Sequence, residues 1–265
     1  MLDIRSKLSD FYSLEQLAAK QTYLHKLHPI AKIIVTLVYI VCVVSFPRYN
    51  IHSLMPYIFY PLFVMAFADI PFSMILKRAM IALPFCLFAG ISNILFDTGI
   101  YRIGTLSIGI GWISCIAILI RSLLSVCAIL ILVAITPFSY LMDGFRQLHT
   151  PNVLVLLFEM TYRYIAVLVE EASTMLTSYR LRYPGAKWPV IQDFGPFIGQ
   201  LFIRSYQRAQ RVYAAMQCRL YALGNKKPIS LVWKKEDTIF VVVLTLLCVV
   251  FRMVDLTVLI GGMLC

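Results

Sequence analysis

Five long apolar runs constrain the fold of this chain more than any other feature of its sequence. An α-helix of about 20 apolar residues crosses the ~30 Å hydrocarbon core of a bilayer. Hydrophobic residues make up 60% of the chain and charged residues 14%, whereas a soluble domain carries about 25% charged residues. The sequence therefore predicts an all-α, multi-pass membrane helix bundle with about five spans. The runs are Ile30–Phe46, His52–Ala68, Met80–Phe96, Trp112–Thr136 and Thr238–Phe251.

Charge gathers between the fourth and fifth runs, where residues 137–236 hold 13 Lys and Arg and 6 Asp and Glu. Two helical patterns, Pro151–Arg182 and Asp193–Ala222, fill most of this stretch, and Tyr183-Pro184-Gly185 separates them. The sequence leaves open whether Leu256–Leu264 forms a further element. We divide the chain into an amphipathic leader (1–29), four spans (30–136), a charged helical domain (137–236) and a C-terminal span (237–265).

The distribution of basic residues predicts the orientation in the membrane. If the N-terminus lies inside, 20 of the 24 Lys and Arg fall on the inner side, 3 on the outer side, and Arg121 within the fourth run. Cytoplasmic loops of membrane proteins collect Lys and Arg, so we expect the leader and the domain 137–236 in the cytoplasm. The same rule explains the net charge of +11 without a nucleic-acid partner.

Motifs for catalysis or metal binding are absent from the sequence. It contains no G-x-x-x-x-G-K-[ST], H-E-x-x-H, G-x-S-x-G or C-x-x-C pattern. His25 and His28 stand three residues apart, but no third ligand is nearby, so we interpret them as interfacial residues. We expect a chain with no catalytic residues, no metal site and no cofactor of its own.

Arg121 is the one charged residue in the middle of a predicted span. Burying an arginine in a bilayer costs at least a few kcal/mol unless it is paired, so it should face the bundle or a partner subunit. A polar contact to a partner and an internal structural pair are equally good interpretations. The spans hold no acidic residue at their centres, so a carbonyl, hydroxyl or amide is the expected partner, and Asn93 is one candidate.

The second helical pattern of the charged domain has one strongly basic face. Arg204, Arg208, Arg211 and Arg219 fall within an arc of about 80° at 100° per residue. Anionic lipid headgroups, RNA and an acidic groove of a protein partner all suit such a face. RNA suits it least, because no aromatic residue interleaves the arginines. On the first pattern, a stripe of Glu159, Arg163 and Glu170 is either a solvated face or a polar seam.

Both helical patterns end alike. One closes on Tyr179-Arg180-Leu181-Arg182-Tyr183 and the other on Met216-Gln217-Cys218-Arg219-Leu220-Tyr221. An arginine in the last turn of a helix is favoured by the helix dipole, which is one explanation. Two copies of the same ending also suggest two equivalent sites for a partner.

At these residues the chain resembles the transmembrane T component of energy-coupling-factor ABC transporters, in particular the cobalt-type CbiQ subfamily. That family carries two Ala-Arg-Gly motifs on cytoplasmic coupling helices. Here Leu181-Arg182-Tyr183 and Cys218-Arg219-Leu220 match them, with both arginines kept and both alanines and glycines replaced. Further resemblance lies in Leu24–Lys32, Leu83-Pro84-Phe85, Thr136-Pro137-Phe138, Thr161–Tyr164, Glu170-Glu171-Ala172 and Arg204–Ala209.

The resemblance implies a non-catalytic scaffold in a prokaryotic cell membrane. It would join two cytosolic ABC ATPase subunits, which bind ATP and Mg, to a membrane substrate-capture subunit for cobalt or nickel uptake. A shared T component of a vitamin importer is the alternative, followed by a stand-alone secondary transporter. The residues expected to contact the ATPase subunits are Arg180, Arg182, Arg204, Arg208, Arg211, Met216, Arg219 and Tyr221.

Overall fold

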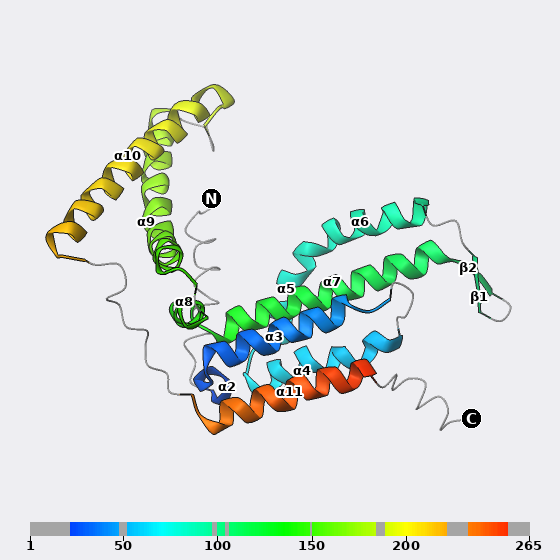
Figure 1. Ribbon diagram of the computed structural model, residues 1–265. Helices are drawn as coiled ribbons and strands as arrows, with labels where there is room; N and C mark the ends of the chain where they lie inside the picture. Colours follow the sequence, from blue (N-terminus) through cyan, green and yellow to red (C-terminus); the bar gives the residue numbers. More distant parts are fainter. Residues whose placement is uncertain are drawn as a thin grey trace. The chain divides into compact units, whose positions relative to one another are not determined.

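The computed structural model describes residues 22–47, 52–96, 100–103, 106–148, 150–183, 189–221 and 233–253. The described residues fall into two compact units, shown in Figure 1. The span unit contains the described residues up to Leu141 together with 233–253. The helix-pair unit contains the described residues from Met142 to Tyr221.

The span unit is a bundle of helices, and the predicted all-α membrane fold is confirmed. A short antiparallel hairpin was not predicted, and its register pairs Ile100 with Gly109. The elements are α2 (Tyr23–Lys26), α3 (Pro29–Val44), the 3₁₀ helix η1 (His52–Ile58), α4 (Phe59–Phe67), α5 (Phe72–Ala79), the 3₁₀ helix η2 (Met80–Ala82), α6 (Leu83–Phe96), β1 (Ile100–Ile103), β2 (Leu106–Gly109), α7 (Ile110–Ile135) and α11 (Lys235–Met253).

The predicted spans correspond to helices, but two of them begin differently. The second opens as a 3₁₀ helix around Pro56, whose ring removes a backbone donor and disfavours a regular α-turn. The third was expected to begin at Met80, yet the helical stretch that spans it runs from Phe72 to Ser92. Lys77 and Arg78, which lie between the second and third predicted runs, therefore belong to helix α5.

Buried tyrosine side chains connect the helices at the centre of the span unit. The Tyr39 hydroxyl on α3 donates to the Tyr57 carbonyl at 2.9 Å, and the Tyr57 hydroxyl donates to the Cys248 carbonyl at 2.7 Å. The rings of Tyr39 and Tyr60 stack at 4.2 Å between centroids. These hydroxyls are satisfied by carbonyls, so the buried aromatic surface stabilises the contact of α3 with η1, α4 and α11 without leaving a polar group unpaired.

Helices α6 and α7 approach closely at Gly90. A Cβ at this position would lie 2.6 Å from the Sγ of Cys115 on α7, so only glycine fits without a shift. Small residues at a crossing allow two membrane helices to come into backbone contact. This pair makes the most extensive packing contact of the span unit.

Two arginine side chains form hydrogen bonds with backbone carbonyls at the C-terminal end of α3 and just after it. Arg121 on α7 donates to the backbone carbonyl of Pro47, so its partner is of the carbonyl class that was expected. Arg252 on α11 donates to the Ser45 carbonyl at 3.0 Å, and its guanidinium lies 4.3 Å from the centroid of the Phe46 ring. Cations are favoured at the carbonyl end of a helix. Asn93, the other candidate for Arg121, lies on α6, but its side chain is outside the described part of the chain.

Candidate docking site on helices α9 and α10

Helices α9 (Asn152–Arg182) and α10 (Ile191–Cys218) form the largest part of the helix-pair unit. Helix α9 follows Pro151 and contains no glycine or proline, so nothing interrupts it, and it matches the predicted run. The second run was expected to reach Ala222. Instead α10 ends at Cys218, because Leu220 has a φ of 52° in the left-handed region, where a helix cannot continue.

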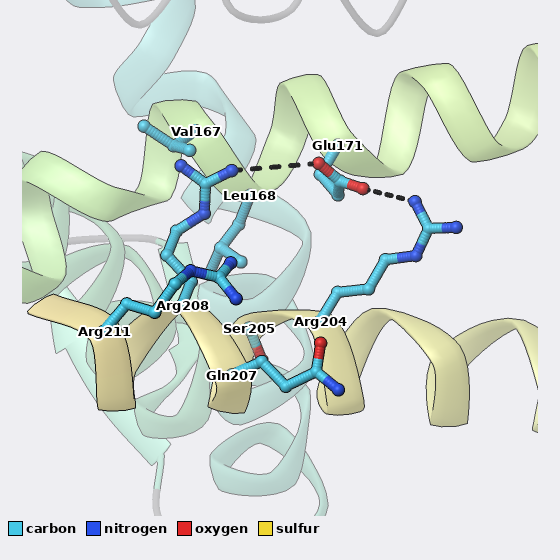
Figure 2. Close-up of a pocket in the computed structure, with 8 residues that line it drawn as sticks. All are labelled: Val167, Leu168, Glu171, Arg204, Ser205, Gln207, Arg208 and Arg211. Atoms are coloured by element: carbon cyan, nitrogen blue, oxygen red, sulfur yellow. Dashed lines mark hydrogen bonds and ion pairs between the residues drawn. The ribbon is translucent and has the colours of Figure 1, made fainter.

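An arginine pocket lies between the two helices. It has a volume of about 230 Å³. Figure 2 shows three arginines of α10 at this pocket, facing residues of α9. The basic face predicted for this helix is thus divided, because Arg219 lies beyond its end. The lining residues are Val167, Leu168, Glu171, Arg204, Ser205, Gln207, Arg208 and Arg211.

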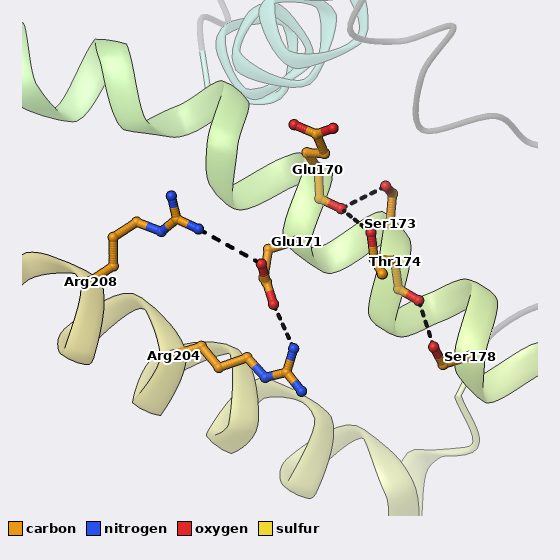
Figure 3. Close-up of polar contacts among 7 residues, drawn as sticks. All are labelled: Glu170, Glu171, Ser173, Thr174, Ser178, Arg204 and Arg208. Carbon is orange, nitrogen blue, oxygen red and sulfur yellow. Dashed lines mark hydrogen bonds and ion pairs between the residues drawn. The ribbon is translucent and has the colours of Figure 1, made fainter.

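Glu171 is the acidic partner of this pocket. Its Oε1 accepts from the Nη1 of Arg204 at 2.6 Å, and its Oε2 lies 4.0 Å from the Nη2 of Arg208 (Figure 3). Glu170 points away from α10 in the same view. The hydroxyls of Ser173 and Thr174 donate to the Glu170 carbonyl, so they form hydrogen bonds within α9. The ion pairs therefore tie α10 to α9 through one carboxylate.

A second polar contact joins the end of α9 to the start of α10. The Tyr179 hydroxyl donates to the Oδ2 of Asp193 at 2.8 Å. That hydrogen bond to a carboxylate raises the pKa of Tyr179 above its ordinary value. Asp193 also lies in the first turn of α10, where a negative charge is favoured by the helix dipole.

The two family-type arginines, Arg182 and Arg219, stand at the helix ends. Arg182 is the last residue of α9 and Arg219 is the C-cap of α10, and both are exposed. Within the part of the chain that the structure describes, neither guanidinium has a hydrogen bond or an ion pair. Each stands beside a leucine with an unusually open side chain, Leu181 at 79% exposure and Leu220 at 87%. Both helix ends therefore present the same pair of groups, an exposed guanidinium next to an exposed leucine side chain.

The remaining predicted contact residues lie around these ends. Arg180 occupies the last turn of α9. The Tyr221 amide donates to the Met216 carbonyl at 3.0 Å, which closes the end of α10. Tyr221 is exposed, whereas Met216 is half-buried and lines an apolar groove between α9 and α10.

An ion network fastens α8 (Phe138–Gln147) to the beginning of α9. Arg146 pairs with Asp143 and with Glu159, both at 3.1 Å, and all three side chains are largely buried. Glu159 had been placed on a stripe with Arg163 from helical spacing. In the structure Glu159 forms a polar seam with α8, which is one of the two interpretations of the stripe, whereas Arg163 is exposed.

A buried polar latch, formed by Lys32 and Asp237 in the span unit, was not found from the sequence. Both residues are 3% exposed. The Nζ of Lys32 donates to the carbonyls of His25 at 3.0 Å and Ile135 at 3.1 Å. Asp237 accepts the backbone N–H of His28 on Oδ1 and that of Lys234 on Oδ2, both at 2.8 Å.

The latch holds two points near the places where the chain leaves and re-enters the span unit. Ile135 is the last residue of α7, and Lys234 precedes α11. Lys32 and Asp237 secure both to the start of α3. The sequence signal was a single lysine inside an apolar run, which has no reason to be buried unless it is bonded.

The two histidines serve this region as structural residues. The Nδ1 of His28 accepts the Ile30 amide at 3.3 Å, and its ring lies 5.1 Å from that of Trp233. In the described residues, no three His, Cys, Asp or Glu side chains group as metal ligands.

Comparison with known proteins identifies relatives of the chain. It is 26% identical over 248 residues to the energy-coupling factor transporter transmembrane protein EcfT of Listeria innocua, covering 85% of this chain and 91% of the relative. The EcfT of Limosilactobacillus fermentum is 25% identical over 177 residues, which cover 60% of this chain and 66% of that protein. The nickel permease LarQ of Lactiplantibacillus plantarum is 29% identical over 84 residues, about a third of each chain.

A family model described as "CbiQ: Cobalt transport protein" matches residues 20–229. The match includes most of the helices of the span unit and all of α8, α9 and α10. Since it covers well over half of the sequence, this multi-pass membrane protein belongs to the CbiQ family of cobalt transport proteins.

Proposed function

We propose that this protein is the transmembrane T component of an energy-coupling-factor importer. In this role α9 and α10 receive the ATP-driven motion of two cytosolic ABC ATPase subunits and pass it to a membrane substrate-capture subunit. The ATPase subunits bind ATP and Mg, and this chain is not catalytic. The family match and the EcfT relatives support this assignment.

The observation that carries the proposal is the pair of exposed arginines at the ends of α9 and α10. A guanidinium donates two parallel hydrogen bonds to a carboxylate, and an adjoining leucine gains free energy only if a partner covers it. Arg182 with Leu181 and Arg219 with Leu220 therefore suit two grooves that are acidic at one side and apolar at the other. Two such ends fit two ATPase subunits.

Transmission of motion requires that the ends of the helix pair be anchored firmly. The ion network of Arg146 braces α8 against α9, and Glu171 ties α9 to α10. The latch of Lys32 and Asp237 secures both exits of the chain to α3.

A transition-metal ion, cobalt or nickel, is the substrate class that we assign. The family description names cobalt, and one relative is a nickel permease. The capture subunit holds the ion, and the leader and the domain 137–236 face the cytoplasm. A vitamin importer is the alternative, and an uptake assay with radioactive cobalt and nickel separates the two.

The proposal is tested by retention of the ATPase subunits on purified variants. As helix caps, the two arginines contribute ~0.3–1 kcal/mol each, and lysine replaces them. As anchors in a partner groove, each costs ~2–5 kcal/mol on truncation, a loss in affinity of about 30-fold to several thousand-fold. We expect Arg182→Ala and Arg219→Ala each to weaken retention, the double variant to abolish it, and lysine to restore little.

Arg163→Ala provides the matched control, because it removes an exposed arginine from the middle of α9. Insertion into the membrane should be unchanged in every variant. Full retention of the ATPase subunits by the double variant would contradict the docking role.

A further inference from the structure

The arginine pocket has an excess of positive charge that the protein does not neutralise. Arg204, Arg208 and Arg211 contribute three cations, and Glu171 contributes one anion. Glu171 bonds closely to Arg204 and lies 4.0 Å from Arg208. Within the described residues Arg211 has no ion pair. The pocket therefore retains donors for an additional anion, and guanidinium groups match a phosphate particularly well.

An apolar groove opens beside this pocket, between α9 and α10. Its volume of about 630 Å³ lies within the ~300–1,000 Å³ range of ligand sites in proteins. Leu168, Ser205 and Arg208 line both the groove and the arginine pocket, so the two spaces adjoin. The other groove residues are Val153, Leu156, Leu157, Met160, Thr161, Tyr164, Ile165, Phe202, Tyr206, Ala209, Val212, Tyr213 and Met216.

Helix α9 supplies about half of this groove and is unusually apolar for a helix outside the predicted spans. By length and composition Asn152–Arg182 is apolar enough to cross a membrane, yet very little of it is buried. Apolar surface left open to water is unfavourable by ~25 cal/mol per Å². The groove therefore favours an apolar ligand, whereas the adjoining pocket favours an anion.

We infer that the helix pair binds an anionic phospholipid, with its phosphate in the arginine pocket and an acyl chain in the apolar groove. Free phosphate satisfies the pocket but leaves the groove uncovered, so the combination points to a lipid. The pair lies in sequence between two predicted membrane spans, α7 and α11. The cytoplasmic leaflet is rich in anionic lipids, and basic residues near it are attracted to its surface.

The test is lipid binding to the purified full-length chain in a neutral detergent, followed by native mass spectrometry. Phosphatidylglycerol and phosphatidylcholine with identical acyl chains are added in parallel. We expect a clear preference for phosphatidylglycerol. Arg211→Gln should weaken its binding about fivefold, as expected for one basic residue at an anionic surface. Arg163→Gln, an exposed arginine outside the pocket, should leave it unchanged.

Two further arms distinguish the source of the phosphate. Leu157→Ser alters an exposed groove residue and should weaken the binding of phosphatidylglycerol. The binding of inorganic phosphate to the arginine pocket should not change in this variant. Inorganic phosphate at concentrations equal to those of the lipid should displace little phosphatidylglycerol. Complete displacement would identify the site as one for free phosphate and overturn the inference.

Other results would overturn it too. Equal binding of the two lipids, or equal loss in Arg211→Gln and Arg163→Gln, would remove the basis for a specific headgroup site. If Arg211→Gln retained lipid at the wild-type level but lost ATPase subunits, the pocket would be a protein-docking surface. The inference does not depend on Arg182 and Arg219, so its failure leaves the proposed function intact.

Discussion

Replacing Asp237 with alanine tests the latch of the span unit most directly. The carboxylate accepts two backbone N–H groups, from His28 and Lys234, and it is close enough to Lys32 for an electrostatic interaction. In Asp237→Ala both donors lose their acceptor, and the buried ammonium of Lys32 loses a nearby negative charge. Lys32 keeps its hydrogen bonds to the carbonyls of His25 and Ile135, but these groups are neutral and do not balance its charge.

The magnitude follows from these lost contacts. Each of the two backbone N–H groups left without a partner costs ~1–3 kcal/mol, and the ammonium of Lys32 loses part of its electrostatic stabilisation. These terms overlap, so we expect a loss of about 3–5 kcal/mol in the free energy of unfolding. For a protein of about 150–250 residues, that loss corresponds to a fall in Tm of roughly 6–20 °C.

The assay is thermal unfolding of the purified full-length chain in detergent. Lys235→Ala serves as the control, because that exposed residue is the neighbour of the latch in α11 and should change Tm little. A double variant, Asp237→Ala with Lys32→Met, removes both charges and should be less destabilised than the sum of the single variants. Equal Tm values for Asp237→Ala and Lys235→Ala, or strict additivity in the double variant, would refute the reasoning.

Three other predictions concern topology, packing and the helix pair. With the other cysteines replaced, exposed Cys218 should react with an impermeant thiol reagent in inverted vesicles but not in intact cells. Labelling of Cys218 in intact cells would contradict the proposed orientation. Gly90→Leu forces a clash between α6 and α7 and should destabilise the protein by ~1–3 kcal/mol. Gly195→Ala, in open space on α10, is the control and should not destabilise it. Equal melting temperatures of the two variants would contradict the close approach of α6 and α7. Tyr179→Phe removes a hydrogen bond to Asp193 and should speed amide exchange in the first turn of α10, measured by mass spectrometry; unchanged exchange would show that the contact is dispensable.

The spans were predictable from the sequence because their requirement is simple. A helix must be apolar over the thickness of a bilayer, and that property is local along the chain. The predicted start of the third span was wrong because the run was begun at Met80, after the charged pair Lys77 and Arg78. Long basic side chains extend to the membrane surface from within a helix, so two charges do not end it. The hairpin at Ile100–Gly109 was missed because two four-residue strands leave little periodicity to detect.

Contacts across the chain were beyond sequence reasoning. A helical wheel placed Arg204 and Arg208 on one face correctly, but it could not show that this face meets Glu171 of α9. It also placed Glu159 on a stripe with Arg163, but it could not show that Glu159 pairs with Arg146 on another helix. The latch brings together residues such as His28 and Asp237, which are 209 positions apart. Such pairs depend on how helices pack, which local patterns do not encode.

The short α3 has a consequence for the lipid around the protein. With 16 residues it is about 24 Å long, whereas α7, with 26 residues, is about 39 Å long. Arg121 and Arg252 fix polar groups at the C-terminal end of α3, so its apolar length cannot be extended there. Two helices of such different length share one bilayer only if the longer one tilts or the membrane thins beside the shorter one. Hydrophobic mismatch of this kind couples the bundle to membrane thickness, and short-chain lipids relieve it at α3 while increasing the tilt of α7.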